Sequence, residues 1–419
     1  MKMATEVMKV LMIILIGVGP VKTDELLRLI LVISNGETTP SITLKESVWA
    51  QEGISQLTKY GIEQEYRNGL YIRDLYTNPN SSLHLLDPYN HRKLIEVQSS
   101  PHDANLMSTE TFLRGLYKPS NITEEHEKPE IMRPVPIYET EYLDVTDCIG
   151  RREIVTREEM NTWDIVAFWG QNQDKIYDLY NKVGYDGNGI NMLEQLYKVY
   201  QYQGFYDLPQ EKALSVYEDI LSEGHELIWN SKMFWSISSV RALAGKAMSE
   251  LNTKISECEN NSCSTEQLLV IYTCTVDTLA WIEEALGIYR GYEPVPGTML
   301  QLEMWGSDNG TYITVKQTQN LRSKEVPVRN CTLKCDVYSF LKITEEYSAT
   351  PEELETLCAD ATYLLKLLTD RLTTVLVSTL TVFCLFGVVL YLVRSRSDTV
   401  SLEAEKSRWS KLLQDDDGF

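Results

Sequence analysis

The run Leu26–Ile33 restricts the fold of this chain more than any other segment. Its sequence, LLRLILVI, is almost continuously apolar and does not alternate polar with apolar residues. A strand with one face in water alternates, whereas an unbroken apolar run is expected of a strand that is covered on both faces. The chain then turns through NGETTP, residues 35–40. The sequence therefore predicts a buried strand whose carboxyl end delivers a short turn.

The segments after this strand change from a mixed to a helical pattern and back. Residues 53–76 favour a helix with apolar side chains on one side, 92–98 favour a second strand, and 99–117 begin as a loop and become a helix. Residues 150–262 are almost entirely helical, and 267–345 return to short strands and turns. This order predicts an α/β core with an inserted helical lobe. The expected domains are residues 23–150 and 263–370 for the core and 151–262 for the lobe.

The two ends of the chain carry apolar segments of different kinds. Residues 1–22 place Lys2 and Lys9 ahead of the run VLMIILIGVG, as a secretory signal peptide does. A buried core helix is the competing interpretation, but the run lacks a cap and an amphipathic period.

Residues 371–393 contain the uncharged run Leu372–Val393, long enough to cross a hydrocarbon layer of about 30 Å. Arg394 and Arg396 follow at once, so the tail, residues 394–419, is expected in the cytoplasm. A lipid-anchor signal would end in its apolar stretch, whereas this chain continues. The sequence therefore predicts a single-pass type I membrane protein.

Charge and sequons agree with an ectodomain outside the cytoplasm. The 419 residues carry a formal net charge of −21, which argues against a nucleic-acid partner because a polyanion needs clustered lysine and arginine. Glycosylation sequons all precede the predicted span; they lie at Asn80, Asn121, Asn260, Asn309 and Asn330. The sequence leaves both the plasma membrane and the endolysosomal lumen open.

Eight cysteines are present, and Cys384 falls within the predicted span. Seven are left for an oxidising lumen, so disulfides and at least one spare thiol are expected. Cys258 with Cys263 and Cys331 with Cys335 are close enough to close small loops. Zinc is disfavoured because neither pair has the CxxC spacing with a second pair nearby. HELIWN, from His225, also lacks the second histidine of a zinc protease. No metal or cofactor is predicted.

A series of landmarks runs through the ectodomain: NGETTP after the first strand, then QLTKYGIEQEYRNGLYIRDLY, DANLMS, YTCTVDTLAWIEEALGIY and CTLKC. In this order they resemble the histidine acid phosphatases, in the branch with the lysosomal and prostatic enzymes and their insect relatives. The resemblance implies a mixed-sheet sandwich core with a helical lobe, acid phosphomonoester hydrolysis, and pairing of two copies as a homodimer. It also implies disulfides Cys331–Cys335 and Cys148–Cys358, with Cys258–Cys263 as a local addition and Cys274 left as the odd thiol.

The chemical residues of that family are missing at the matching positions. The family motif R-H-G-x-R-x-P holds the nucleophilic histidine and phosphate-binding arginines, but Ser34, Asn35 and Thr38 stand in their places. In the second arginine-bearing stretch the arginines are matched by Gln98 and Ala104. The late His-Asp pair is matched by Thr275 and Val276, or by Val276 and Asp277 if the register slips by one.

An asparagine amide cannot replace an imidazole as nucleophile, and each lost cation around a transferring phosphoryl group can cost about 10³-fold in rate. The sequence therefore predicts an inactive pseudophosphatase whose ectodomain binds a protein or small-molecule ligand of unknown identity. The alternative is a weak acid phosphatase in which His102 acts as a relocated catalytic group, with Asp103 or Asp277. A solvated loop histidine is the competing interpretation of His102.

Overall fold

A computed structural model gives the fold of the chain. It describes residues 24–44, 53–81, 83–86, 92–118, 134–143, 163–185, 189–206, 212–233, 237–259, 262–263, 266–358, 385–388 and 404–407. The chain divides into two compact units, Met1–Cys358 and Ala359–Phe419. The predicted signal peptide, residues 1–22, lies outside the described residues.

In the second unit the structure describes only two short helical stretches, residues 385–388 and 404–407. Most of the predicted span 371–393 and of the tail 394–419 therefore lies outside the described part. Among the helices that are described, none is both long enough and apolar enough to cross a bilayer.

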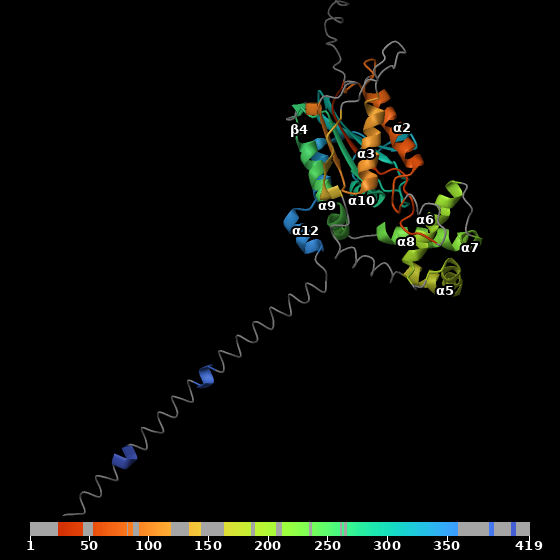
Figure 1. Cartoon of the computed structure of the whole chain (residues 1–419). Coiled ribbons are helices and arrows are strands. Elements are labelled where there is room, and N and C mark those ends of the chain that lie inside the picture. The colour runs from red at the N-terminus through yellow and green to blue at the C-terminus, as the bar shows by residue number, and fades with distance from the viewer. Residues whose placement is uncertain are drawn as a thin grey trace, which may run out of the picture. The chain divides into compact units, whose positions relative to one another are not determined.

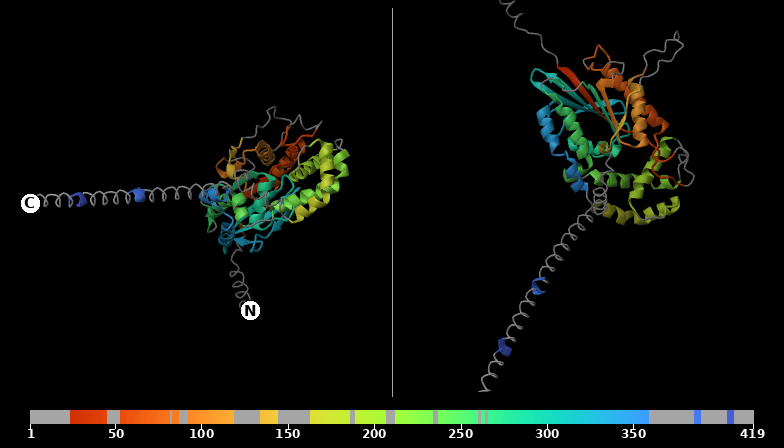
Figure 2. Two further views of the ribbon diagram at one scale, coloured as in Figure 1. Left: turned by 90° about the horizontal axis from the view of Figure 1, so that it is seen from below. Right: turned by 60° about the vertical axis from the view of Figure 1, so that its left-hand side comes forward.

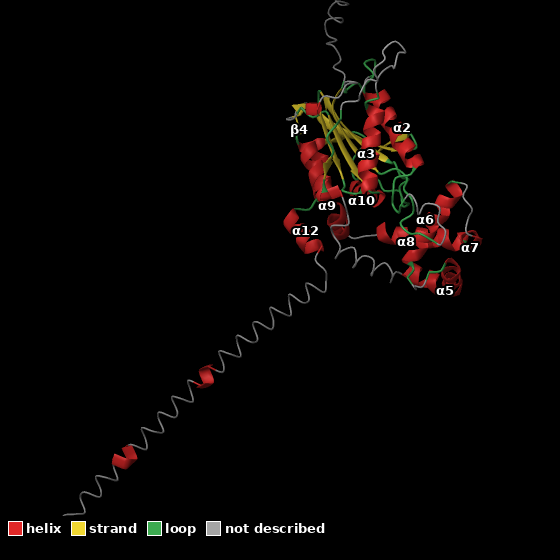
Figure 3. Cartoon of the chain, in the orientation of Figure 1, coloured by secondary structure: helices red, strands yellow, loops and turns green. Residues whose placement is uncertain are grey.

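The first unit is built on one mixed sheet of eight strands, ordered β10-β8-β7-β1-β6-β2-β3 with β9 paired to β8. Figure 3 shows the strands in yellow between helices. The strands are β1 Glu25–Ser34, β2 Ile95–Ser99, β3 Tyr138–Glu139, β6 Leu269–Cys274, β7 Met299–Ser307, β8 Gly310–Gln319, β9 Arg322–Val326 and β10 Cys335–Asp336. A separate small hairpin pairs β4 Cys258–Glu259 with β5 Ser262–Cys263.

Strand β1 occupies the centre of the sheet, as its apolar sequence predicts. It runs parallel to β6 and antiparallel to β7. Ile30 and Val32 belong to the core on one face, and Leu29, Leu31 and Ile33 to the core on the other. Both faces of the strand are covered, so no side chain in its middle part has to be polar in order to face water.

Helices cover both faces of the sheet (Figure 1). The bounds of those that pack around it are α2 Lys59–Tyr76, α3 Asp103–Leu116, α9 Ile237–Ser256, α10 Val276–Leu286, α11 Val337–Glu345 and α12 Pro351–Cys358. The pair α2 and α3 packs on the face of Leu29 and Leu31, whereas α9 and α10 pack on the face of Ile30 and Val32. Short 3-10 turns lie at Arg92–Leu94 and Glu141–Leu143.

The helical lobe has its own apolar core, separate from that of the sheet. It consists of α5 Trp163–Val183, α6 Asn191–Phe205, α7 Lys212–Val216 and α8 Glu218–Met233. Figure 2 shows these yellow-green helices beside one end of the sheet. The block 151–262 was predicted as lobe, but α9 contributes Ala244, Met248 and Leu251 to the core of the sheet. The stretch 267–345 contains helices α10 and α11 as well as the predicted strands.

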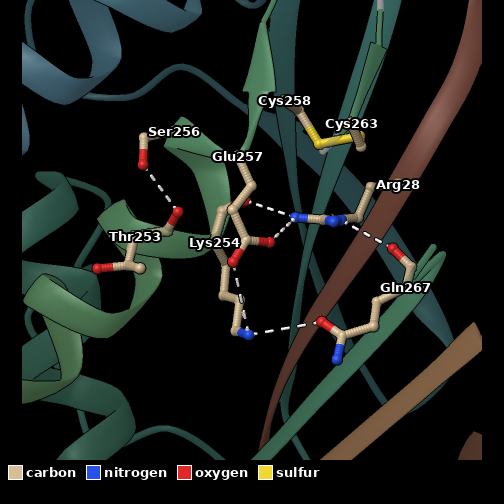
Figure 4. Close-up of a disulfide and its surroundings, with 8 residues drawn as sticks. All are labelled: Arg28, Thr253, Lys254, Ser256, Glu257, Cys258, Cys263 and Gln267. Carbon is tan, nitrogen blue, oxygen red and sulfur yellow. Dashed lines mark hydrogen bonds and ion pairs between the residues drawn. A yellow bond between two sulfur atoms is a disulfide. The ribbon is translucent and has the colours of Figure 1, made fainter. Parts of the chain in front are cut away.

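Buried Arg28 ties the end of α9 to the sheet (Figure 4). Its guanidinium donates to the carbonyl oxygens of Lys254 at 2.7 Å and Gln267 at 2.9 Å, and it pairs with Glu257 at 2.7 Å. This explains the one charged residue in the apolar run, because a buried cation must be fully paired. The disulfide Cys258–Cys263 closes the hairpin next to these contacts.

The other predicted cysteine and sequon positions are placed as follows. A second disulfide joins Cys331 and Cys335, and Cys274 is free and buried. Cys358 is disulfide-bonded, and its predicted partner Cys148 lies outside the described residues. Among the sequons, Asn80, Asn309 and Asn330 are exposed, whereas Asn121 and Asn260 fall outside the described part. The three exposed asparagines are accessible to a glycosyltransferase. Their glycosylation stays a prediction.

Helices α2 and α3 approach so closely that glycine is required at their contact. A Cβ on Gly115 would lie 2.2 Å from the carbonyl oxygen of Tyr66, and one on Gly69 would lie 2.0 Å from that of Phe112. Neither neighbour is a flexible side chain, so the helices themselves would have to separate.

We predict that Gly115→Ala lowers the free energy of unfolding by about 1–3 kcal/mol, because the added methyl forces the two helices apart. Gly170→Ala is the matched control, since Gly170 is exposed on α5 and a Cβ there would meet no described atom within 4 Å. It should leave stability unchanged or raise it by about 0.5–1 kcal/mol. Chemical denaturation of both variants measures the difference; equal effects would contradict the close approach.

Candidate functional site

The carboxyl ends of β1, β6 and β2 meet at one edge of the sheet. In the strand register Ser34 lies beside Cys274, and Thr273 beside Ser99. The backbone N–H of Asn35 donates to the carbonyl oxygen of Cys274 at 2.9 Å. Ligands of parallel α/β sheets bind at such strand ends. The structure therefore brings together the segments in which Ser34, Asn35, Thr275 and Val276 match the family site.

The turn after β1 is clamped by the start of α2. Gly36 packs so tightly on Gly61 that a Cβ would meet its carbonyl oxygen at 2.7 Å. The N–H of Thr58 donates to the carbonyl oxygen of Glu37 at 3.0 Å, and Gln64 Oε1 accepts from the N–H of Glu37 at 3.2 Å. These contacts give a structural reason for Gly36 in the turn and for Gly61 and Gln64 in the segment QLTKYGIEQ. The reason holds whatever the turn binds.

Further backbone contacts fix both ends of the same turn. The N–H of Gly36 donates to Ser108 Oγ of α3 at 3.1 Å, and Thr38 forms an isolated bridge with Leu57. The N–H of Gly297 donates to the carbonyl oxygen of Asn35 at 2.8 Å. The turn is therefore held from three sides through its backbone.

The side chains at the matching positions are neutral and bonded locally. Ser34 is fully buried, and its Oγ accepts from the N–H of Thr298 at 3.1 Å. Asn35 Nδ2 donates to the carbonyl oxygen of Gly36 at 2.8 Å. Gln98, one residue back from the end of β2, donates to Glu96 at 2.5 Å. Ala104 is buried in the first turn of α3. None of these groups carries charge to a ligand.

Three helix N-termini lie near this edge. Two of them are capped by a threonine side chain, and the third has an acidic residue in its first turn. Thr58 caps α2 by accepting from the N–H of Gly61, and Thr275 caps α10 by accepting from the N–H of Thr278. Helix α3 has Asp103 in its first turn. A capped or acidic N-terminus is a poor anion site, because its N–H groups and positive dipole end are already compensated.

Glu37 adds a negative charge to the turn itself. Its carboxylate accepts from Thr58 Oγ1 at 3.0 Å and from the hydroxyl of Tyr206, beyond the end of α6, at 2.7 Å. Burial raises the pKa of Glu37, while the two hydrogen bonds oppose part of that rise. The residue therefore joins the turn to the helical lobe and repels a second anion.

The alternative catalytic residues sit at the first turns of two different helices. His102 is exposed and precedes α3, with extended backbone and no side-chain cap bond. Asp103 follows it and is exposed, whereas Asp277 is half-buried in the first turn of α10. The placement of His102 agrees with a solvated loop residue.

Charged side chains that sequence reasoning did not select come from the helical lobe. Lys198 of α6 and His225 of α8 both contact Glu293, with N···O distances of 3.2 Å and 3.1 Å. Lys198 also lies 3.7 Å from Glu194 and interacts electrostatically with Asp277. The spacing of Glu194 and Lys198 is visible in the sequence as an i,i+4 pair. Glu293 is remote in sequence, so no local pattern could have joined it to them.

Carboxylates compensate the charge of Lys198. Burial alone would raise the pKa of Glu293, but Lys198 and His225 outweigh it and lower that pKa to about 2. Burial likewise lowers the pKa of Lys198, and the carboxylates of Glu293, Glu194 and Asp277 raise it above its usual value. One ammonium faces three carboxylates, so the cluster does not restore a positive field.

Glu65 lies on the face of α2 that supports the site. It is fully buried, and its Oε2 accepts from Asn68 Nδ2 at 3.3 Å. Its Oε1 has no hydrogen-bond partner among the residues that the structure describes. Asn68 in turn donates to the carbonyl oxygen of Gly297 at 2.9 Å. Burial raises the pKa of Glu65 to about 8, with only a small opposing effect of Asn68.

We predict that Glu65 makes the protein less stable as pH rises from about 4.5 to about 8. Its carboxyl loses a proton near 4.5 when unfolded but only near 8 when folded, so the folded state binds more protons in this window. The slope from one such group reaches about 1.4 kcal/mol per pH unit. Glu65→Gln should remove this contribution, and Glu63→Gln, which is exposed on the same helix, should not. Denaturation at several pH values measures it; identical profiles would contradict the buried acid.

Comparison with known proteins gives relatives of one kind, although no family model matches the chain. It is 25% identical over 344 residues to prostatic acid phosphatase of Bos taurus, covering 78% of this chain and 86% of that protein. It is 23% identical to the Mus musculus protein, covering 80% and 90%. Lysosomal acid phosphatase of Homo sapiens is 24% identical, with 74% of each chain covered. The homologues of this chain are thus prostatic and lysosomal acid phosphatases, as the sequence landmarks predict.

Solved structures with the same fold are phytases and a related phosphatase. The Citrobacter braakii phytase has a TM-score of 0.55 at 15% identity, covering 80% of this chain and 99% of that one. The apo Hafnia alvei phytase has a TM-score of 0.56 at 12% identity, covering 81% and 99%. The Bifidobacterium longum multiple inositol polyphosphate phosphatase has a TM-score of 0.52 at 11% identity, covering 80% and 96%. These likenesses confirm the mixed α/β sheet fold.

Proposed function

We propose that this homologue of the prostatic and lysosomal acid phosphatases keeps their fold without their chemistry and acts by binding. The observation that carries the proposal is the content of the turn after β1. Its backbone is held on three sides, yet Ser34, Asn35 and Thr38 offer neither the imidazole nucleophile of the family nor a cation.

The absence of an imidazole at Asn35 supports the loss of the family chemistry at this position. A phosphohistidine forms when an imidazole nitrogen attacks phosphorus, whereas an amide nitrogen is not basic. Asn35 Nδ2 also donates to a neighbouring carbonyl, which uses its hydrogen-bonding capacity within the turn. On this proposal the turn cannot form the covalent phosphohistidine intermediate.

The missing cations count against even the binding of phosphate. A dianion in a partly buried site needs donors and positive charge to replace its hydration. Here the matching arginine positions are Ser34, Thr38, Gln98 and Ala104, and Glu37 adds a negative charge. The field at the turn should thus repel phosphate.

The competing function is weak phosphomonoester hydrolysis through His102. It needs an acid or base partner and an oxyanion-stabilising group within reach of the same phosphorus. His102 and Asp103 are exposed at the start of α3, whereas Asp277 is at the start of α10. An exposed histidine without a cationic pocket supports little catalysis.

The setting of this binding protein is also proposed from sequence. A signal peptide at 1–22, a span at 371–393 and sequons on the intervening part would make it a type I membrane glycoprotein. Some homologues are called lysosomal acid phosphatase, which agrees with an ectodomain in a lumen or outside the cell. A protein or small molecule would be its ligand, and a second copy its partner in a homodimer.

We predict no turnover of p-nitrophenyl phosphate at pH 5 above the buffer rate, because nucleophile and clamp are both absent. His102→Ala should give the same rate as the wild type. Purified protein and variant assayed side by side measure this. Turnover in the wild type that disappears in His102→Ala would instead establish the hydrolase.

We also predict that Asn35→His alone stays inactive and unphosphorylated, because an imidazole without its arginine clamp faces Glu37 instead of cations. Phosphorus NMR of the variant after exposure to acetyl phosphate would detect phosphohistidine. A triple variant that also carries Thr38→Arg and Gln98→Arg serves as the comparison. Its two arginines supply positive charge, so phosphorylation of the histidine should be more favourable in it. A phosphohistidine signal in the single variant would show that the clamp is not needed.

A further inference from the structure

The carboxylate of Glu293 is held as a bound ligand would be. One oxygen lies 3.2 Å from Lys198 Nζ, and the other lies 3.1 Å from His225 Nε2. The two donors come from different helices of the lobe, whereas Glu293 comes from the segment between α10 and β7. Two donors, one for each oxygen, is the arrangement by which proteins bind a carboxylate group.

His225 is held by a contact that does not involve Glu293. The ring of His225 stacks on Tyr197 with centroids 4.4 Å apart, and its side chain is only 12% exposed. Its Nδ1 is buried and has no hydrogen-bond partner in the described part of the chain. Without Glu293 the imidazole would lose the polar contact of Nε2, which is costly for a buried group.

The segment that delivers Glu293 is held on both sides of that residue. It contains Gly287, Gly291 and Gly297, all with left-handed backbone. Trp229 of α8 donates to the hydroxyl of Tyr289 at 2.7 Å, and Gly297 donates to Asn35. The segment therefore contacts the lobe near its start and the turn after β1 near its end.

We propose that Lys198 and His225 form a carboxylate-binding site on the helical lobe, which Glu293 fills from within the chain and an external carboxylate can occupy in its place. The expected ligand carries a single negative charge at this point. Glu194 and Asp277 lie near the same ammonium and would repel a second charge, so phosphate is disfavoured. The site does not depend on the loss of phosphatase activity, since none of its residues matches the family motifs.

The test is chemical rescue of Glu293→Ala in the full chain, with acetate as the probe. The substitution leaves space for a carboxylate between the two donors. We expect Glu293→Ala to bind carbon-13-labelled acetate at least about tenfold more tightly than the wild type, with a melting temperature that rises with acetate. Adding Lys198→Met should abolish both effects.

Two variants serve as controls. Glu293→Gln keeps the space filled with a neutral group and should not respond to acetate. Glu284→Ala removes a carboxylate at the same 3.2 Å distance from one cation, Arg329, and with similar exposure. Its single donor should give a weaker response.

The outcomes separate cleanly. Folding of Glu293→Ala that depends on acetate supports the site. An acetate response that survives Lys198→Met, or that is equal in Glu284→Ala, overturns it. Failure of Glu293→Ala to fold with or without acetate also overturns it, because a site for an external carboxylate must accept one. Phosphatase assays are not involved, so this result is independent of the proposed function.

Discussion

The backbone contact between Gly36 and Gly61 is the constraint on which the site depends. The close approach seats the start of α2 on the turn after β1 and lets Thr58 and Gln64 bond to the backbone of Glu37. The turn is thereby fixed at the end of a fully buried strand. Its shape needs glycine and backbone hydrogen bonds, and it makes no demand on the side chains at Asn35 or Thr38.

On the proposed function, this separation of shape from chemistry explains how a fold can persist without the activity. Catalytic side chains point out of a turn that other residues hold, so replacing them leaves the supporting contacts unchanged. Charged groups at such a site are costly in the absence of a ligand, because they repel each other and lose hydration. Here Ser34, Asn35 and Thr275 are instead satisfied by bonds within the chain.

The sequence predicted those parts of the structure that local patterns encode. The apolar run predicted a strand buried on both faces, and β1 lies at the centre of the sheet. The parallel strands β1 and β6 end at the same edge, where Asn35 bonds to Cys274, the residue before Thr275. The assignment of α9 to the lobe was wrong, because its amphipathic pattern does not say which core it joins. Helix α10 was missed within a stretch that was expected to form strands and turns, since it is short and largely apolar.

The charges around the site were the least predictable part. Glu293 reaches Lys198 and His225 only after the lobe has packed on the core, and no spacing in the sequence records that contact. The same is true of Tyr206, which meets Glu37 across the lobe boundary. Motifs identify the residues that stand at a candidate site, whereas only the fold shows which groups surround it.

The most direct test of this account is a calorimetric titration of the full chain with inorganic phosphate at pH 5 and pH 7. If the turn has kept its shape but lost its positive charge, no saturable binding tighter than about 1 mM should appear at either pH. A dissociation constant in the micromolar range would contradict the account, because it would require cations at the site that compensate a phosphate.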